Sequence, residues 1–477
     1  MTTNEKYAKK GEDPAFAECI DVAVIGSGFA GLAAAIEAKS TGSRVCIFEK
    51  MKAAGGNSAI SDGGIAIPGT EQQTLCGIHD SPGLMYDDML RAGLNLNHPT
   101  LVKTLVGRAK QTFEWTVNEL GVEYMDKIDL FGGHSAPRCF TAKGRSGATI
   151  IRKQVERLKS LGVEIRYQSY FKRFLVDTEG QIAGIIIQTG YEHTNPRVGK
   201  DIHIRVKRGI VLATGGFGSD IAFRSAQDPR LSSAVDTTNK PFTNSDAMKQ
   251  AFGIGALPVQ LSCIQLGPWA SPDEKGYGVG PFFSEYVVFQ HGIIVDPQTG
   301  LRVVNELADR KTLSDALLAV GHPCLGLADS RGVEISGWSI DECLKKGIVR
   351  AFRSLTELAT YYGIPSNELC GAVERYNRSV DNGEDEQFNK SILKESRTIA
   401  NPPYYGMRLW PKVHYTMGGV GINKHAQVLD LDGKPISRLF AAGEVTGGVH
   451  GASRLGSCSI TDCLVFGRIA GKNAARS

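Results

Sequence analysis

The first group of residues with the spacing for ligand chemistry is a glycine run, G-S-G-F-A-G, at positions 26–31. An apolar β-branched run, Ile20–Ile25, precedes it, and a helix-forming stretch, Leu32–Lys39, follows it. In this order of strand, turn and helix, the first glycine permits a tight turn and the second lets backbone N–H groups reach a pyrophosphate. The third lets the helix pack closely on the strand. The residues of this turn predicted to bind the cofactor are Gly26, Gly28, Phe29, Ala30 and Gly31.

An acidic residue stands where a nucleotide ribose would need one. A second apolar run, 44–48, ends at Glu49, eighteen residues beyond Gly31, and Lys50 follows it. A carboxylate at this point can accept hydrogen bonds from ribose hydroxyls. A glycine turn in an ordinary βαβ unit is the alternative, and the strand, helix and acid together favour a dinucleotide.

Further glycine-rich elements favour FAD over NAD as the cofactor. The first is G-G-N-S at 55–58 with Gly63 and Gly64 after it, the second is 209–218, and the third is 439–448, which runs into a helix. Several separated elements of this kind suit a long dinucleotide held along its whole length. The additional residues predicted to bind the cofactor are Gly56, Asn57, Ser58, Gly63, Gly64, Ala213, Thr214, Gly215, Gly443, Glu444, Ser459 and Ile460.

Composition supports a large ligand-binding protein and excludes several other classes. The chain has 477 residues, 42% hydrophobic content and 56 glycines, enough for two or three domains with many tight turns. The net charge of +4 is small, and Lys and Arg are dispersed among Asp and Glu, so no nucleic-acid partner is expected. The ten cysteines show no paired spacing and no C-x-x-C-H motif. We therefore expect reduced thiols, no metal site and no haem on this chain.

Targeting signals are weak in this sequence. No window reaches the roughly 18 consecutive apolar residues of a membrane-spanning helix. The N-terminal residues 1–18 are polar and contain no hydrophobic signal core. We expect a cytoplasmic protein, or a periplasmic one if a leader peptide has been removed.

Longer motifs resemble one protein family. They are A-T-G-G at 213–216, N-E-L-A-D-R at 305–310, H-Y-T-M-G-G at 414–419 and A-A-G-E-V-T-G-G-V-H-G-A-S-R-L-G at 441–456. Together they resemble the flavoprotein subunits of fumarate reductases and succinate dehydrogenases, most closely the soluble flavocytochrome c branch. The resemblance extends over about residues 21–475.

The resemblance implies an α/β fold with a Rossmann-like, doubly wound FAD-binding domain and an inserted α+β capping domain. Placed by motif, the parts are an N-terminal extension at 1–18, the FAD domain at 19–260, the cap at 261–414 and the rest of the FAD domain at 415–477. Membrane-bound members attach FAD covalently through a histidine in the flavin loop. This chain has Asn57 there, which implies noncovalent FAD.

The same resemblance assigns the chemistry of reducing an activated alkene. Reduced FAD would deliver hydride from N5, Arg310 would donate the proton, His414 and Arg454 would hold the substrate carboxylate, and Glu444 would lie against the ribityl chain. The residues themselves leave alternatives open. Arg310 could form a surface ion pair, His414 could be a buried structural histidine, and Arg454 could bind an FAD phosphate.

Departures from the family pattern bear on the substrate. Fumarate reductases hold the second carboxylate with a histidine and a threonine, where this sequence has Gly267 and Trp269. A later threonine-glutamate pair becomes Ser284 and Glu285, and a relay arginine becomes Val288. The second carboxylate therefore lacks its partners, which indicates a substrate with one carboxylate. The residues predicted to bind substrate are His414, Arg454, Trp269 and Gly447, and Glu285 is the candidate proton relay to Arg310.

Aromatic residues crowd the same segment, 265–286. They either wall an apolar substrate pocket or simply pack the cap. The aromatic residues of this segment are Trp269, Tyr277, Phe282, Phe283 and Tyr286.

The sequence thus favours an FAD-dependent reductase of a 2-enoate of the acrylate, methacrylate, arylacrylate or urocanate type. Without haem motifs, it would need a separate electron donor, such as a multihaem cytochrome c or another reduced carrier. The alternatives are a fumarate reductase proper, an enzyme like aspartate oxidase or ketosteroid dehydrogenase, and a catalytically silent FAD subunit. Arg310, His414 and Arg454 together argue against the silent subunit.

Overall fold

The computed structural model describes residues 16–392 and 395–477, so the predicted extension at 1–18 lies largely outside the described residues. The chain forms two compact units. The main unit contains the described residues up to Ser232, Lys240–Ile264 and Tyr415–Ser477, and the inserted unit contains Ser233–Asn239 and Gln265–His414.

These limits differ slightly from those placed by motif. The sequence puts the first boundary after residue 260 and does not assign residues 233–239 to the insertion. This segment groups with the inserted unit because Thr237 bridges to Val413 and the Thr238 N–H donates to the Val413 carbonyl at 2.9 Å. Such backbone pairing between segments about 175 residues apart has no local sequence signal.

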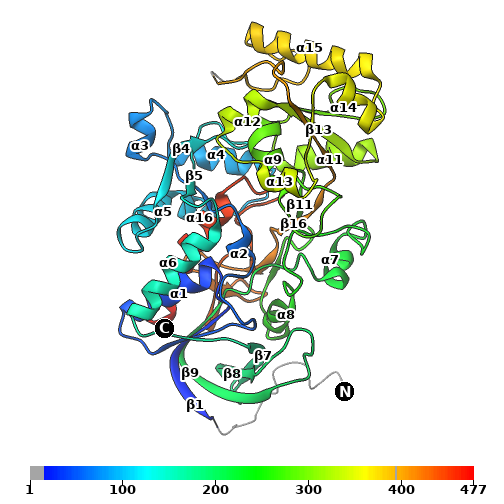
Figure 1. Ribbon diagram of the computed structural model, residues 1–477. Coiled ribbons are helices and arrows are strands. Elements are labelled where there is room, and N and C mark those ends of the chain that lie inside the picture. Colours follow the sequence, from blue (N-terminus) through cyan, green and yellow to red (C-terminus); the bar gives the residue numbers. More distant parts are fainter. Residues whose placement is uncertain (1–15, 393–394) are drawn as a thin grey trace. The chain divides into compact units, whose positions relative to one another are not determined.

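The largest sheet of the main unit is mixed, and its strands β1, β7, β8 and β9 are labelled in Figure 1. Its continuous strand order is β18-β19-β9-β1-β2-β6, and β7 and β8 extend from β9. The pairs around β1 are parallel, and Val22 to Ile25 are buried, as expected for a strand covered on both faces. The strands are β1 (Glu18–Ile25), β2 (Val45–Phe48), β6 (Glu164–Arg166), β7 (Ser169–Val176), β8 (Ile182–Thr189), β9 (Lys200–Leu212), β18 (Gln427–Leu429) and β19 (Pro435–Ala441).

Two glycines let the first and last helices of the main unit approach closely. An added Cβ at Gly467 would lie 2.5 Å from the Ala30 carbonyl oxygen, and one at Gly471 would lie 2.0 Å from that of Ala34. The C-terminal helix therefore packs backbone to backbone on the helix that follows the glycine turn. The helices are α1 (Phe29–Ser40), α2 (Gly56–Ile60), α3 (Glu71–Leu75), α4 (Pro82–Ala92), α5 (Pro99–Asn118), α6 (Gly147–Ser160), α7 (Ile221–Gln227), α8 (Asp246–Gly253) and α16 (Cys458–Ala474).

Two small sheets complete the main unit. One has the order β3-β5-β4, from β3 (Gly64–Ala66), β4 (Tyr124–Asp129) and β5 (Cys139–Ala142). The other has the order β10-β17-β20, from β10 (Pro258–Val259), β17 (Gly419–Gly421) and β20 (Thr446–Gly447).

The inserted unit is a mixed α+β structure. Its four-stranded sheet has the order β12-β13-β15-β14 and is antiparallel throughout. Strands β11 (Ile264–Gly267) and β16 (Lys412–Thr416) pair where the chain enters and leaves the unit. The other elements are α9 (Gly280–Phe283), a π-helical turn (Ser284–Val288), α10 (Phe289–His291), β12 (Ile293–Val295), α11 (Arg310–Val320), β13 (Cys324–Asp329), α12 (Ser330–Ser336), α13 (Asp341–Lys345), β14 (Arg350–Phe352), α14 (Leu355–Tyr362), α15 (Ser366–Asn382) and β15 (Tyr404–Leu409). The predicted α/β fold with an inserted α+β unit is confirmed.

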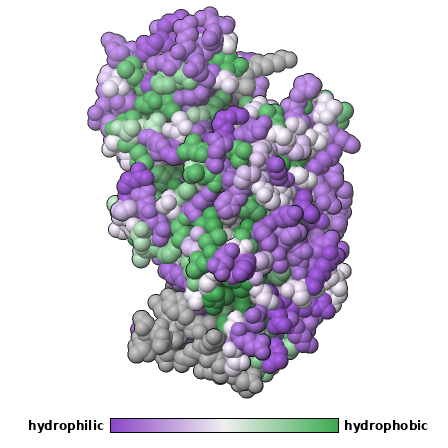
Figure 2. Space-filling view, turned by 180° about the vertical axis from the view of Figure 1, so that it is seen from behind, coloured by the Kyte–Doolittle hydropathy of each residue, from purple (hydrophilic) through white to green (hydrophobic). Residues whose placement is uncertain are grey.

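Figure 2 shows a face on which hydrophilic side chains predominate and apolar side chains gather in smaller patches between them. Within the part of the chain that the structure describes, no helix is both long enough and apolar enough to cross a bilayer.

Candidate functional site

A cleft in the main unit opens where β1, β2 and β9 end. It holds about 940 Å³ of space between the lining residues, part of it open to solvent. The carboxyl ends of parallel strands are where such folds bind nucleotides. The predicted cofactor residues that line it are Gly26, Gly28, Phe29, Ala30, Glu49, Lys50, Gly56, Asn57, Ser58, Ala213, Thr214, Gly215, Gly443 and Glu444.

The glycine turn has the geometry that an anion site requires. Gly26 has a φ of 100°, and an added Cβ there would lie 2.4 Å from the Ala213 carbonyl oxygen. Gly28 is the N-cap of α1 and provides no side-chain cap, while the Phe29 N–H donates to Ser58 Oγ at 3.2 Å. The helix N-terminus, with its positive dipole end, therefore faces the cleft without a carboxylate in its first turn.

Glu49 is held rigidly beside this turn. One carboxylate oxygen accepts from the Ser27 N–H at 3.1 Å and the Ser27 hydroxyl at 2.6 Å. The other accepts from the Met51 N–H at 2.8 Å. A carboxylate has further acceptor positions, so this fixed group fits the ribose-binding role predicted for it.

The predicted cofactor residues that do not line the cleft are Gly31, Gly63, Gly64, Ser459 and Ile460. An added Cβ at Gly31 would lie 2.0 Å from the Gly26 carbonyl oxygen, and one at Gly64 would lie 2.7 Å from Ser457 Oγ. Thr461, in the first turn of α16, donates its hydroxyl to the Ala66 carbonyl at 2.8 Å. These contacts position α1 and the start of α16.

Sequence reasoning missed a polar side of the cleft. The Tyr170 hydroxyl donates to the Asp246 carboxylate at 2.9 Å, and Lys50 Nζ donates to Asn244 Oδ1 at 3.2 Å. Burial raises the pKa of Tyr170 and lowers that of Lys50. Tyr170 lies in β7, Asn244 precedes α8 and Asp246 begins it, all outside every glycine element. Glycine spacing therefore could not reveal these three residues, and only Lys50, which follows Glu49, was predicted. The other lining residues not predicted are Ile25, Ser27, Phe48, Gly55, Ser169, Phe171, Phe242, Thr243, Ala247, Ala442 and Cys463.

Glu444 follows β19 and lines the same cleft. Its carboxylate accepts from the Thr416 N–H at 3.0 Å. Burial raises its pKa from 4.5 to about 7, although the Thr416 N–H and the Arg454 charge oppose this. The group is therefore poised between its neutral and charged forms near neutral pH.

Arg454 lies in the loop between β20 and α16 and is 3% exposed. Its Nη1 donates to the Leu455 carbonyl at 2.8 Å, and its guanidinium carbon lies 4.6 Å from the centroid of the Tyr415 ring. Gly447, predicted to bind substrate, is in β20, where an added Cβ would lie 2.7 Å from the Val259 carbonyl oxygen. Packing of β20 against β10 alone explains this glycine.

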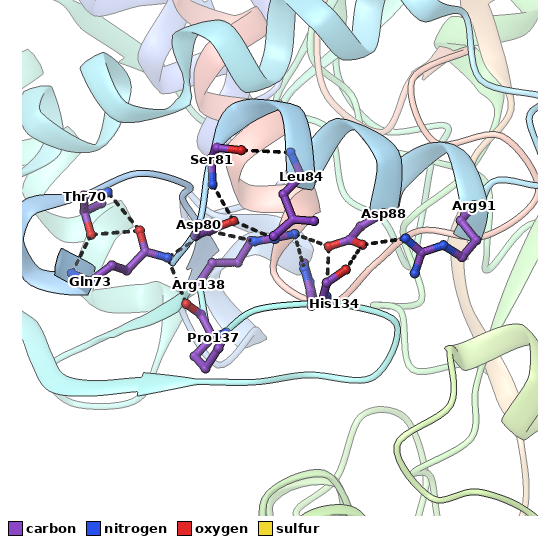
Figure 3. Close-up of polar contacts among 11 residues, drawn as sticks. Thr70, Gln73, Asp80, Ser81, Leu84, Asp88, Arg91, His134, Pro137 and Arg138 are labelled. Carbon is purple, nitrogen blue, oxygen red and sulfur yellow. Dashed lines mark hydrogen bonds and ion pairs between the residues drawn. The ribbon is translucent and has the colours of Figure 1, made fainter. Parts of the chain in front are cut away.

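A buried ionic network supports the loop after Arg454 (Figure 3). Arg138 pairs with Asp80 at 2.7 Å and with Asp88 at 2.6 Å, and all three side chains are fully buried. Arg138 Nη1 also lies 3.2 Å from His134 Nδ1, and His134 Nε2 lies 3.0 Å from the Gly456 carbonyl oxygen. Since a guanidinium only donates and a carbonyl only accepts, the neutral Nε2–H tautomer satisfies both contacts. This network, which sequence reasoning missed, fixes the backbone between Arg454 and α16.

In the inserted unit, the predicted acid and its predicted relay are in direct contact. Arg310 is the first residue of α11, which Asp309 caps, and Glu285 lies in the π-helical turn. Arg310 Nη2 donates to Glu285 Oε1 at 2.6 Å, with 11% and 8% of the two side chains exposed. The pair is therefore buried, unlike a surface ion pair.

Trp269 connects this pair to His414. The Arg310 guanidinium carbon lies 5.6 Å from the centroid of the Trp269 ring, and the His414 ring packs edge-on against that indole at 4.6 Å. His414 Nδ1 is 2.8 Å from the Thr238 hydroxyl, which fixes the imidazole plane. The structure thus brings the predicted residues Trp269, Glu285, Arg310 and His414 together, while Arg454 belongs to the main unit.

The other aromatic residues of segment 265–286 mostly pack the inserted unit. Tyr286 stacks on Trp338 at 3.7 Å, Phe282 stacks on the same ring at 5.5 Å, and Phe283 is fully buried in the core. Tyr277 contacts Trp269 at 5.5 Å. Of the two interpretations of this segment, packing explains the later aromatics.

Glu306 of the N-E-L-A-D-R motif has a structural role that the sequence did not reveal. It pairs with Arg302 at 2.8 Å, and Arg302 also pairs with Asp385 at 2.9 Å, with all three side chains fully buried. Lys390 Nζ lies 3.3 Å from Glu306. This cluster anchors the segment that leads to Arg310.

Known proteins share this architecture. The family model of the FAD binding domain matches residues 21–460. An acrylate reductase flavoprotein subunit from Shewanella woodyi is 41% identical over 460 residues, which are 95% of this chain and 90% of that protein. A fumarate reductase (cytochrome) from Shewanella frigidimarina is 33% identical over 461 residues, 96% and 77% of the two chains. Among solved structures, the open conformation of a flavocytochrome c3 fumarate reductase matches with a TM-score of 0.76 and 31% identity, over 97% of this chain and 79% of that one.

Proposed function

Because the chain belongs to the FAD binding domain family and is an FAD-dependent oxidoreductase acting on CH–CH groups, we propose that it reduces the C=C bond of a 2-enoate with one carboxylate. The predicted family and the FAD cofactor are confirmed. The substrates that we propose are acrylate, methacrylate, arylacrylates and urocanate, with Arg310 as the proton donor. The observation that carries the proposal is the buried Arg310–Glu285 pair beside Trp269 and His414.

Arg310 needs a way to regain its proton. An arginine side chain normally stays protonated, so it acts as an acid only where a neighbouring base returns the proton quickly. Glu285 Oε1 accepts from Arg310 Nη2 at 2.6 Å, which is a direct path for that return. We assign Arg310 as the acid and Glu285 as its relay.

The carboxylate of the substrate would be bound by His414 and Arg454. A guanidinium and an imidazole that donate to this group polarise it and stabilise the negative charge that develops as the double bond is reduced. Bound FAD, in its reduced form, supplies the hydride from N5. The ribityl chain is assigned to Glu444, which lines the cleft and is half-buried.

The flavin is proposed to be noncovalent. Asn57 lines the cleft and accepts from the Lys240 N–H at 2.8 Å. Its amide is not a nucleophile that could bond to the flavin as the family histidine does. Acid precipitation of the purified protein is expected to leave all FAD in the supernatant, and flavin fluorescence on the denatured chain would contradict this.

Electrons are proposed to come from a separate carrier, a multihaem cytochrome c or another reduced donor. The Shewanella woodyi relative is named as a flavoprotein subunit and the Shewanella frigidimarina relative as a cytochrome enzyme. The first name supports a separate partner subunit, and the second supports a haem group as the electron donor.

The decisive experiment is anaerobic reoxidation of the dithionite-reduced protein, followed by recovery of flavin absorbance. The panel is fumarate, acrylate, methacrylate, cinnamate, caffeate and urocanate. We expect a monocarboxylate to reoxidise the flavin faster than fumarate does. If no compound reoxidises it, the reductase assignment is wrong.

A second candidate is fumarate reduction, which the 31% identity with the flavocytochrome c3 structure favours. Fast reoxidation by fumarate alone in the same panel would select it and would refute our interpretation of Gly267 and Trp269.

A further inference from the structure

Gly267 and Trp269 are coupled by direct contact. A Cβ added to Gly267 would lie 2.9, 3.0 and 3.1 Å from the indole atoms Cη2, Cζ2 and Cζ3 of Trp269. Gly267 ends β11 and does not have a positive φ, so its backbone accepts any L-residue. The nearest obstacle to a side chain at position 267 is the benzene ring of the indole, which would have to shift to admit a Cβ.

The indole has little freedom to move away. Trp269 is 1% exposed, and its backbone carbonyl accepts from the Ser284 hydroxyl at 2.7 Å. The His414 ring lies edge-on at 4.6 Å and the Tyr277 ring at 5.5 Å. Trp269 is therefore fixed between His414 and Arg310, the two residues of this unit to which we assign substrate chemistry.

We propose that Trp269, seated on Gly267, is the specificity-determining residue that restricts the substrate to one carboxylate. This inference rests on the proposed enoate reductase function. The face of an indole carries negative quadrupole charge, which attracts the Arg310 cation and repels an anion. A second carboxylate beside it would lose its hydration, whereas a hydrogen, methyl or aryl group would gain apolar contact. The substrate class is a 2-enoate whose other end is uncharged.

The physical coupling can be tested without turnover, by thermal unfolding of the FAD-loaded protein. Gly267→Ala is expected to lower Tm when Trp269 is present and to leave it unchanged in a Trp269→Thr background. Equal effects in the two backgrounds, or no effect in either, would overturn the contact on which the inference rests.

Specificity is tested with two further variants in the reoxidation assay. The double variant Gly267→His, Trp269→Thr restores the residues that the family resemblance places here, and the ratio of the fumarate rate to the acrylate rate is expected to rise roughly tenfold or more. Trp269→Phe conserves most of the apolar wall and is expected to shift the ratio less, so a poorly folded double variant does not prevent the test. If the wild type reduces acrylate and both variants retain its ratio, the inference is wrong. If the wild type reduces no enoate, the proposed function itself fails.

Discussion

The two units contribute different kinds of groups to the site, backbone groups in one and side chains in the other. In the main unit much of the cleft is lined by glycine-rich backbone, in the turn at 26–31, at the uncapped start of α1 and in the turns after β9 and β19, with side chains such as Glu49 and Tyr170 beside it. In the inserted unit they are side chains from four distant segments, Trp269, Glu285, Arg310 and His414. A site made of backbone is determined by local glycine spacing, whereas a site made of side chains depends on tertiary contacts. Cofactor binding and substrate chemistry should therefore be separable by mutation.

The largest expected effect on turnover is that of the Arg310→Ala substitution. Loss of a general acid should lower turnover by roughly 10²–10⁴-fold, with FAD per chain unchanged because Arg310 belongs to the inserted unit. Steady-state rates with a reduced dye and flavin absorbance measure the two quantities.

The matched control is Lys311→Ala, which removes a neighbouring, half-exposed cation paired with Asp315 and should leave the rate unchanged. The opposite variant, Gly26→Ala, should lower FAD content, since its φ of 100° disfavours alanine. Retained turnover in Arg310→Ala, or lost flavin, would break the proposed separation.

Arg138→Ala tests whether the main unit also depends on side chains. Removal of the guanidinium leaves Asp80 and Asp88 as buried carboxylates without their counter-ion. Breaking a buried pair in this way costs about 3–5 kcal/mol of stability. Denaturant unfolding measures the change, and Arg230→Ala is the control, because that arginine is 84% exposed beside Asp228. A loss below about 1 kcal/mol, the usual value of a surface pair, would show that the network is dispensable.

The same contrast explains which parts of the fold and of the site could be predicted from the sequence. The βαβ order and the glycine elements predicted the FAD fold and half of the residues that line the cleft. Gly26 shows why such positions can be predicted, because its positive φ and its approach to the Ala213 carbonyl leave no room for another residue. The Tyr170–Asp246 pair, the Arg138 network and the Glu306 cluster were missed. Each joins residues distant in sequence, whose types are common on any protein surface. Arg310 was found only through a family resemblance, and its contact with Glu285 was a hypothesis that the geometry agrees with.

Glu444, in the cleft of the main unit, is expected to make the stability of the protein depend on pH. Burial raises its pKa from 4.5 to about 7, so the folded, flavin-free protein holds a proton that the unfolded chain releases. Stability from this group is therefore highest below about pH 4.5 and is lost as pH rises through about 7, a change on the order of 3 kcal/mol. Glu444→Gln should remove this part of the pH dependence, as measured by chemical unfolding at pH 5 and pH 8. An unchanged pH dependence would mean that Glu444 is charged in the folded state at both pH values.

The smallest expected effect, and the sharpest test of the side-chain site, is on Glu285→Gln. A glutamine oxygen can still accept from Arg310 Nη2, so the arginine keeps its position while the group that carries the proton is lost. We expect kcat to fall about tenfold, less than for loss of the acid itself, with KM little changed. Glu342→Gln, an exposed glutamate of the same unit, is the control. If turnover and its pH profile are unchanged in Glu285→Gln, the carboxylate only orients Arg310, and the proton must return by another path.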